Sequence, residues 1–308
     1  MEYIFNALLP ICLIISTGYF FKSIKFPSTE FWPKMDKFTY YVLMPCLLIY
    51  ELGSVDLDIK STINIVFSSL SSLGIMLVIL VLLNLIIRFK NAEFTSVVQG
   101  GIRFNTYVFL ALTSAIYGKD GLVVAAIIIA FAIPFVNILC ISIFAIYIKN
   151  GKFSMQNFIK TIVKNPLIVA CIVGYILNLA NAYIPTFIFK SLSIVSHAAL
   201  PMGLLSVGVG FELRSISSAK KEILVSSFAK LVLLPIIAYL LAKLMGANGL
   251  YLAVATLYAA MPTAPTSHIL SRELGGDVNL MSSITTFEIL LSMATLFCYH
   301  TDAWIYVV

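Results

Sequence analysis

Four polar side chains interrupt apolar stretches of this sequence: Arg103, Asn105, Lys230 and Glu288. A guanidinium or ammonium group attracts anions, an asparagine amide both donates and accepts hydrogen bonds, and a carboxyl group can carry a proton. A charged residue inside an apolar span faces a cavity or another charge, because facing lipid costs about 3 kcal/mol or more. These residues predict a site for a small anion, with Arg103 or Lys230 raising the affinity and Glu288 balancing charge or carrying a proton.

The segment that holds Arg103 and Asn105 has a counterpart later in the chain. The first reads Gly100-Gly101-Ile102-Arg103-Phe104-Asn105-Thr106, and the second reads Met261-Pro262-Thr263-Ala264-Pro265-Thr266-Ser267-His268. Prolines three residues apart cannot both sit in an unbroken helix, and paired glycines weaken one. We expect both segments to interrupt their helices. The candidate substrate-binding residues are Asn105, Thr106, Arg103, Pro262, Thr263 and Thr266, and the candidate break or hinge residues are Gly100, Gly101, Pro45, Pro201 and Pro265.

Each assignment has a structural alternative. Lys230 and Glu288 can form an ion pair that holds two helices together, and Asn105 can cap the helix that follows it. Histidine can change its charge in the physiological pH range, so His268 joins Lys230 and Glu288 as a candidate coupling or charge-balancing group, although a lone histidine on a membrane helix is more often a packing residue. Asn137 lies three residues after Pro134, where a role in bending the helix is favoured over a ligand role.

The elements that position these residues are membrane helices. The 308 residues are 60% hydrophobic and 11% charged, a composition typical of a chain whose solvent is lipid. Apolar runs that are long enough to span a bilayer as helices, and too long for barrel strands, lie near residues 3–21, 38–54, 63–87, 94–117, 121–148, 165–181, 187–211, 223–245, 249–271 and 278–299. The predicted fold class is therefore an all-α integral membrane protein with ten transmembrane helices.

Basic residues predict the orientation of these helices. The connections after the odd-numbered runs hold Lys22, Lys25, Lys34, Lys37, Arg88, Lys90, Lys149, Lys152, Lys160, Lys164, Arg214, Lys220, Lys221 and Arg272, whereas the other connections hold Lys60, Lys119, Lys190 and Lys243. Cytoplasmic loops carry the excess of lysine and arginine. We therefore expect a multi-pass protein of the cell (plasma or inner) membrane with both termini extracytoplasmic. The formal charge of +6 needs no nucleic-acid partner to explain it.

The chain also repeats. Pro10, Gly18, Tyr19 and Pro45 align with Pro166, Gly174, Tyr175 and Pro201 at a shift of 156, and Thr106, Ser114, Gly118 and Asp120 align with Thr263, Ser271, Gly275 and Asp277 at a shift of 157. Five spans in each copy make the second copy enter the bilayer inverted. We predict repeats at 1–150 and 165–308, joined by a cytoplasmic linker at 151–164.

The two interrupted segments are predicted to lie at the same depth in the membrane. At a rise of about 1.5 Å per residue, both breaks lie roughly 14–18 Å into the membrane, near its midplane. Non-helical backbone at that depth must be buried in protein or line a cavity. The fourth and ninth helices are thus expected to cross there, with half-helix N-termini that favour an anion such as a carboxylate.

Five segments together resemble the bacterial auxin efflux carrier family, whose plant relatives are the PIN-formed auxin exporters. They are Leu9-Pro10 with Gly18-Tyr19, Tyr41-Val42-Leu43-Met44-Pro45, Arg103-Phe104-Asn105-Thr106 with Tyr117-Gly118, Leu200-Pro201-Met202-Gly203-Leu204, and Met261-Pro262-Thr263-Ala264 with Gly275-Gly276-Asp277. The resemblance implies a scaffold of spans one, two, six and seven, often dimeric, and a mobile core of spans three to five and eight to ten. Elevator-type movement of that core would carry the site across the membrane.

The predicted function is secondary active transport of a small organic anion. A uniport channel or facilitator for small anions, and a ligand sensor on a transporter scaffold, stay open as alternatives. An enzyme is not expected, because the sequence has no HExxH, no GxSxG and no paired intramembrane aspartates. The five cysteines are scattered singly and indicate no metal site. No cofactor is expected beyond a coupling ion, H⁺ or Na⁺, and the expected partners are the substrate, the lipid bilayer and a second copy of the chain.

Overall fold

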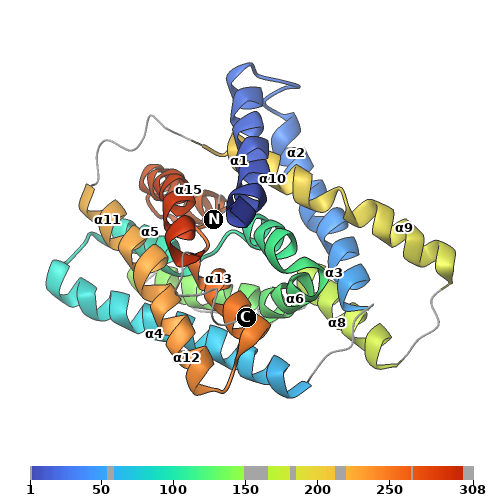
Figure 1. Ribbon diagram of the computed structural model, residues 1–308. Helices are drawn as coiled ribbons and strands as arrows, with labels where there is room; N and C mark the ends of the chain where they lie inside the picture. The colour runs from blue at the N-terminus through green and yellow to red at the C-terminus, as the bar shows by residue number, and fades with distance from the viewer. Residues whose placement is uncertain are drawn as a thin grey trace.

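The computed structural model describes residues 2–53, 59–148, 166–180, 185–211, 220–264 and 266–300. All regular secondary structure in these ranges is helical, as predicted (Figure 1). The predicted linker at 151–164 and the candidate hinge residue Pro265 lie outside the described residues. The prediction of an all-α protein is therefore confirmed for the described part of the chain.

The first half contains α1 (Glu2–Ser23), α2 (Phe31–Phe38), the π-helical turn η1 (Thr39–Leu43), α3 (Met44–Leu52), α4 (Ile59–Ile87), α5 (Asn91–Ile102) and α6 (Thr106–Tyr147). The second half contains α8 (Pro166–Leu179), α9 (Thr186–Ser196), α10 (Ala199–Val209), α11 (Lys220–Phe228), the π-helical turn η3 (Ala229–Leu233), α12 (Leu234–Leu244), α13 (Gly249–Ala260), α14 (Ser267–Leu274) and α15 (Val278–His300). The predicted second run is thus divided between α2, η1 and α3, and the predicted seventh run between α9 and α10.

Several helical stretches are apolar and long enough to cross a membrane. They are Ile63–Ile87, Asn91–Tyr147, Thr186–Val209 and Lys221–Leu244, and the shorter Leu9–Ser23 and Gly249–Ala260 are apolar too. These stretches support a multi-pass membrane protein. The complete set of ten inverted crossings stays a prediction.

The stretch Asn91–Tyr147 is too long for one crossing. Its 57 residues would extend about 85 Å as a straight helix, against a hydrocarbon core of roughly 30 Å. Two interruptions divide it: Arg103–Asn105 between α5 and α6, and Gly118 within α6, whose φ of 64° and ψ of −148° are not helical. Gly118 lies where the sequence predicts the connection between the fourth and fifth runs, and a positive φ there favours glycine.

Glycines at equivalent positions of the repeat occupy equivalent places in the fold. Gly275, which aligns with Gly118, also has a positive φ, of 85°. A Cβ atom on Gly18 would lie 2.0 Å from the carbonyl oxygen of Leu205, and one on Gly174 would lie 3.2 Å from the Cα of Ile49. A shift of 156 residues maps Gly18 onto Gly174 and Ile49 onto Leu205. The contact between Gly18 and Leu205 therefore corresponds to the contact between Gly174 and Ile49. The α1–α10 and α3–α8 contacts are therefore equivalent under this shift.

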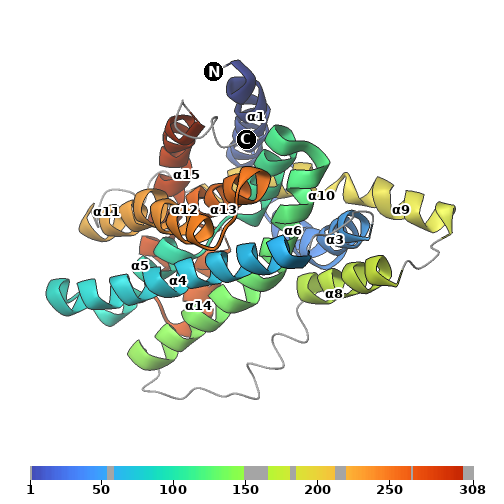
Figure 2. The same ribbon diagram turned by 60° about the horizontal axis from the view of Figure 1, so that its bottom comes forward.

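The helices form two groups with α6 between them. In one group α1 packs against α10, and α3 packs against α8 and α9; in the other, α4 packs against α12 and α13, and α5 against α11 and α15. The first group lies on the right and the second on the left in both views, apart from α1 at the top (Figures 1 and 2). Helix α6 contacts α3, α8 and α10 on one side and α4, α5 and α13 on the other.

Two prolines follow π-helical turns. Pro45 is the second residue of α3, directly after η1, and Pro235 is the second residue of α12, directly after η3. Proline has no N–H and its ring clashes with the carbonyl of the preceding turn, so a wider turn accommodates it. Pro201 is the third residue of α10 and is exposed, in the first turn of a helix where an N–H has no intrahelical partner.

Candidate functional site

The two interrupted segments lie against each other. The chain leaves the helical conformation at Arg103–Asn105, between α5 and α6, and again after α13 at Met261, before α14 begins at Ser267. The backbone N–H of Asn105 donates to the carbonyl oxygen of Pro262 at 2.8 Å. The hydroxyl of Thr263 lies 3.1 Å from the carbonyl oxygen of Gln99 and 3.2 Å from that of Arg103. Both helices therefore break where the sequence predicts, and backbone polar groups of the two breaks satisfy each other.

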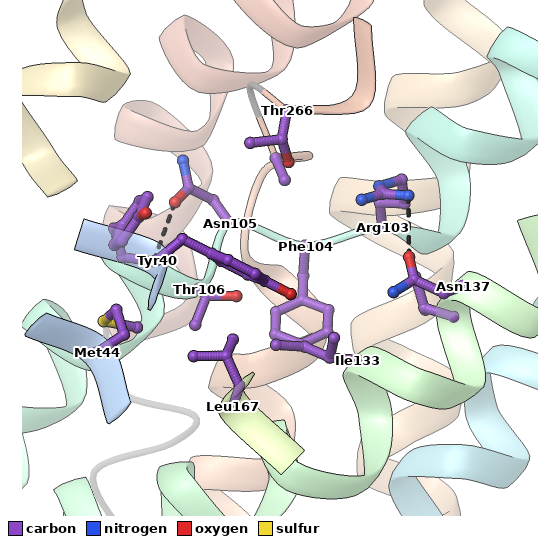
Figure 3. Close-up of a pocket in the computed structure, with 13 residues that line it drawn as sticks. Tyr40, Met44, Arg103, Phe104, Asn105, Thr106, Ile133, Asn137, Leu167 and Thr266 are labelled. Carbon is purple, nitrogen blue, oxygen red and sulfur yellow. Dashed lines mark hydrogen bonds between the residues drawn. The ribbon is translucent and has the colours of Figure 1, made fainter. Parts of the chain in front are cut away.

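A cavity of about 120 Å³ opens beside the first break (Figure 3). Its polar side is formed by Arg103, Asn105, Thr106, Asn137 and Thr266, and its apolar side includes Tyr40, Met44, Phe104, Ile133 and Leu167. This volume is several times the roughly 10–15 Å³ that one water needs, so the cavity has room for a small molecule. A small carboxylate with a short apolar part fits these dimensions.

Asn105 both caps a helix and faces the cavity. Its side-chain oxygen accepts hydrogen bonds from the backbone N–H groups of Tyr107 at 3.1 Å and Val108 at 3.2 Å, which caps α6 as the structural alternative predicts. Its side-chain nitrogen is buried and has no hydrogen-bond partner among the described residues. The cap fixes the amide so that its two N–H donors stay available to a molecule in the cavity.

Arg103 places a positive charge on the cavity wall. Its Nη1 donates to the Oδ1 of Asn137 at 3.3 Å, and its guanidinium also interacts with the thiol of Cys140. Its Nε is buried without a partner among the described residues. Both partners are neutral, so the charge of Arg103 has no carboxylate counter-ion in this part of the structure. An anion in the cavity would supply one.

Glu288 and Lys230 lie behind the second break. Glu288 is fully buried, and its carboxylate accepts the Thr263 N–H and the Ser226 hydroxyl, each at 3.0 Å. Lys230 is also fully buried, with its Nζ 5.9 Å from the centre of the Tyr258 ring and without a hydrogen-bond partner among the described residues. The two are electrostatic neighbours, but the contact is not a direct ion pair. Glu288 thus contacts the second break directly, and neither residue lines the cavity.

The other predicted residues are distributed around these groups. Thr106 and Thr266 line the cavity, whereas Thr263 is fully buried between the breaks and Pro262 lies on a small apolar cavity on another side. Gly100 and Gly101 are still helical in the last turn of α5. A Cβ on Gly100 would lie 2.0 Å from the Ser226 hydroxyl oxygen, so this glycine serves close packing. The non-helical stretch itself begins at Arg103.

His268 lies at a second polar contact. It is half-buried on α14 and interacts electrostatically with Asp36 of α2. The Ser206 hydroxyl of α10 hydrogen bonds with the same Asp36 carboxylate. Burial raises the pKa of Asp36, and this effect outweighs the opposing effects of Ser206 and His268.

Among the cavity side chains that carry a polar atom, sequence reasoning missed three: Asn137, Tyr40 and Tyr107. Asn137 carried a usable signal, because a polar residue inside a membrane span is a functional candidate by default. The nearby Pro134 drew the interpretation toward a helix bend instead. Tyr40 and Tyr107 carried no such signal, since tyrosine is common at membrane interfaces and in packed cores.

Comparisons with known proteins agree with a membrane carrier. The family profile described as "Membrane transport protein" matches residues 3–300. An uncharacterized transporter of Methanocaldococcus jannaschii is 22% identical over 299 residues, covering 93% of this chain and 96% of that protein. Auxin efflux carrier component 1 of Arabidopsis thaliana is 24% identical over 147 residues, covering 46% of this chain and 24% of the plant protein. A candidate malonate transporter of Rhizobium meliloti is 29% identical over 132 residues, 42% of this chain and 41% of that protein.

Proposed function

Because the chain belongs to the membrane transport protein family, which includes auxin efflux carriers, we propose that it moves a small organic anion as a secondary active transporter. The substrate is a carboxylate that binds in the cavity beside the first break. One relative is a candidate malonate transporter and another an auxin efflux carrier, and organic acids are therefore the first substrates to test.

The observation that supports this proposal most directly is a pair of hydrogen-bond donors without partners among the described residues. The Asn105 side-chain nitrogen and the Arg103 Nε are both buried, and neither has a partner among the described residues. An unsatisfied buried polar group costs about 1–3 kcal/mol, more when it is charged. A bound carboxylate would satisfy both donors and neutralise Arg103. We assign Asn105, Arg103, Thr106 and Thr266 to the substrate.

The arrangement of the helices supports alternating access. The group α1, α3, α8, α9 and α10 would be the scaffold, and α4 to α6 with α11 to α15 would be the core that moves as an elevator. The cavity lies between them, since Met44 comes from α3 and Tyr40 from η1 directly before it, whereas Arg103 and Asn105 lie between α5 and α6. A core that slides along the scaffold would carry the anion with it.

The proposal includes the orientation of the chain in the membrane and its oligomeric state. Both termini would be extracytoplasmic in the cell membrane, which makes Tyr40, Leu167 and Thr266 residues of the cytoplasmic side of the cavity. We propose a homodimer formed through the scaffold. Helices α8 and α9 expose the apolar side chains Ile172, Ile176 and Phe187, which suit lipid or a second copy.

The coupling ion is proposed to be a proton, with Glu288 as the first candidate carrier. Its carboxylate holds the Thr263 N–H of the second break, so a change in its charge would act directly on that break. Lys230 would balance that charge, and His268 would contribute at the contact with Asp36. A transport rate with the same pH dependence in wild type and Glu288→Gln would exclude Glu288 from coupling.

Uptake into proteoliposomes tests the proposal. Radiolabelled malonate, butyrate and phenylacetate would be offered to wild type and to Asn105→Ala, with and without a pH gradient. We expect saturable uptake of at least one acid, counterflow after preloading, and a loss of at least tenfold in kcat/KM for the variant. A wild type that transports none of these acids would contradict the anion assignment, and unchanged uptake in Asn105→Ala would contradict the site.

The same vesicles separate a carrier from a channel or facilitator. A carrier shows counterflow, because the site that releases unlabelled substrate on the outside returns to the inside with labelled substrate bound. A channel gives flux without counterflow or saturation. Binding without any flux would instead favour a ligand sensor.

A further inference from the structure

The cavity contains a polar residue with a defined contact that the proposed function does not yet use. Asn137 lies on α6, half-buried, and lines the cavity together with Ile133, one helical turn before it. Cys140 follows one turn later and also contacts Arg103. Positions 133, 137 and 140 share one face of a helix. That face therefore meets the guanidinium group and the cavity at once.

The chemistry of the contact fixes the orientation of Asn137. A guanidinium group has five N–H donors and no acceptor, so only the side-chain oxygen of Asn137 can face it. This oxygen accepts from the Arg103 Nη1 at 3.3 Å (Figure 3). With Nη1 held in this way, the guanidinium is restrained on a residue that lines the cavity, and its Nε has no partner among the described residues.

The neutrality of Asn137 matters as much as its oxygen. An aspartate has nearly the same shape and would bind Arg103 more strongly, as a charge-assisted pair. Such a pair would neutralise the one cationic side chain that lines this cavity in the described structure. An anion would then gain little from binding there. An uncharged acceptor positions Arg103 and leaves its charge for the substrate.

We propose that Asn137 is a positioning and specificity-determining residue, which holds Arg103 through a neutral acceptor so that the site binds anions. This inference rests on the proposed function, since it assumes that Arg103 binds the transported anion. It assigns Asn137 a role through Arg103 and not through the bend at Pro134.

Two variants of nearly equal size separate charge from shape. Asn137→Asp keeps an acceptor for Arg103 and cancels its charge, whereas Asn137→Leu removes the acceptor and leaves the charge. A hydrogen bond to a charged group corresponds to about 10- to 100-fold in binding. We expect each variant to raise the KM for uptake of malonate, butyrate or phenylacetate by at least about tenfold. The melting temperature of Asn137→Asp should not fall below that of wild type, because it gains an ion pair.

The matched control is Asn84→Asp. Asn84 is a buried asparagine, and its side-chain oxygen accepts the Phe89 N–H at 3.0 Å, away from the cavity. Its KM should stay within about twofold of wild type, since distant sites act independently.

A double-mutant cycle tests whether Asn137 acts through Arg103. In an Arg103→Lys background the ammonium no longer has the planar geometry that Asn137 holds, so Asn137→Leu should change KM by less than about threefold. An equal effect of Asn137→Leu in both backgrounds would overturn the inference, as would a wild-type KM in Asn137→Asp. A fall in melting temperature that accounts for the lost uptake of both variants would assign Asn137 to packing. Absence of uptake in wild type would overturn the proposed function itself, and this inference with it.

Discussion

Asn105 and Pro262, which the internal repeat aligns at a shift of 157, are joined by a hydrogen bond of 2.8 Å between the Asn105 N–H and the Pro262 carbonyl oxygen. In the predicted inverted repeat, equivalent residues that contact each other would lie at the axis that relates the two halves. Proline has no N–H, so the reciprocal bond cannot form. The two halves therefore meet at this hydrogen bond, and they differ there because only Asn105 can donate one.

The role of Asn105 divides into a cap and a donor. Asn105→Asp keeps the oxygen that caps α6 but replaces the N–H donors by a negative charge, so we expect anion uptake to fall at least about 100-fold with little loss of stability. Asn105→Ala should lose the cap as well, at about 1 kcal/mol. Uptake and melting temperature measured together check this. Retained uptake in Asn105→Asp would show that the amide nitrogen does not contact the substrate.

Lys230 and Glu288 should depend on each other for stability. Lys230→Met leaves the fully buried Glu288 without its cationic neighbour, and removing one member of a buried charge pair costs about 3–5 kcal/mol. Adding Glu288→Gln should restore most of this loss, because the glutamine oxygen can still accept the Thr263 N–H. Thermal unfolding of the two single variants and the double variant measures the coupling. Additive effects would mean that the charges do not interact.

The α1–α10 contact should not tolerate a methyl group. A Cβ on Gly18 would lie 2.0 Å from a backbone oxygen of Leu205, which cannot move aside. We expect Gly18→Ala to destabilise the protein by about 1–3 kcal/mol. Gly74 is the matched control, because a Cβ there would meet nothing within 4 Å, and Gly74→Ala should stabilise α4 by about 0.5–1 kcal/mol. Equal melting temperatures for both variants would contradict the close approach of α1 and α10.

Stability should depend on pH through Asp36. Burial raises the pKa of this carboxyl above 3.8, so the folded state favours its protonated form. The associated stabilisation is present below the unfolded pKa and is lost as the pH rises through the folded value. An asparagine side chain at this position cannot ionise, and its oxygen can still accept a hydrogen bond from the Ser206 hydroxyl. Asp36→Asn should therefore melt higher than wild type at pH 8, and the difference should shrink toward pH 4. A constant difference across this range would assign it to packing.

The membrane class and the two helix breaks could be read from the sequence because their signals are local. Apolar run length fixes the helices, and Pro262 fixes the second break through its missing N–H. The contact partners of each side chain could not be predicted from the sequence, since they depend on which helix faces the fold brings together. Thr263 appeared equivalent to Thr106, yet its hydroxyl contacts backbone oxygens between the breaks while Thr106 lines the cavity. Asn137 and Arg103 are 34 residues apart, and only the fold makes them neighbours.

The hydrogen bonds of Thr263 limit how the protein can move. Its hydroxyl and N–H groups connect α5, the second break and α15 through buried hydrogen bonds, in a place that no water reaches to replace them. Separating these elements would cost several such bonds at about 1–3 kcal/mol each. We therefore expect the two breaks to move together as one unit in any conformational change, with the hinges outside them.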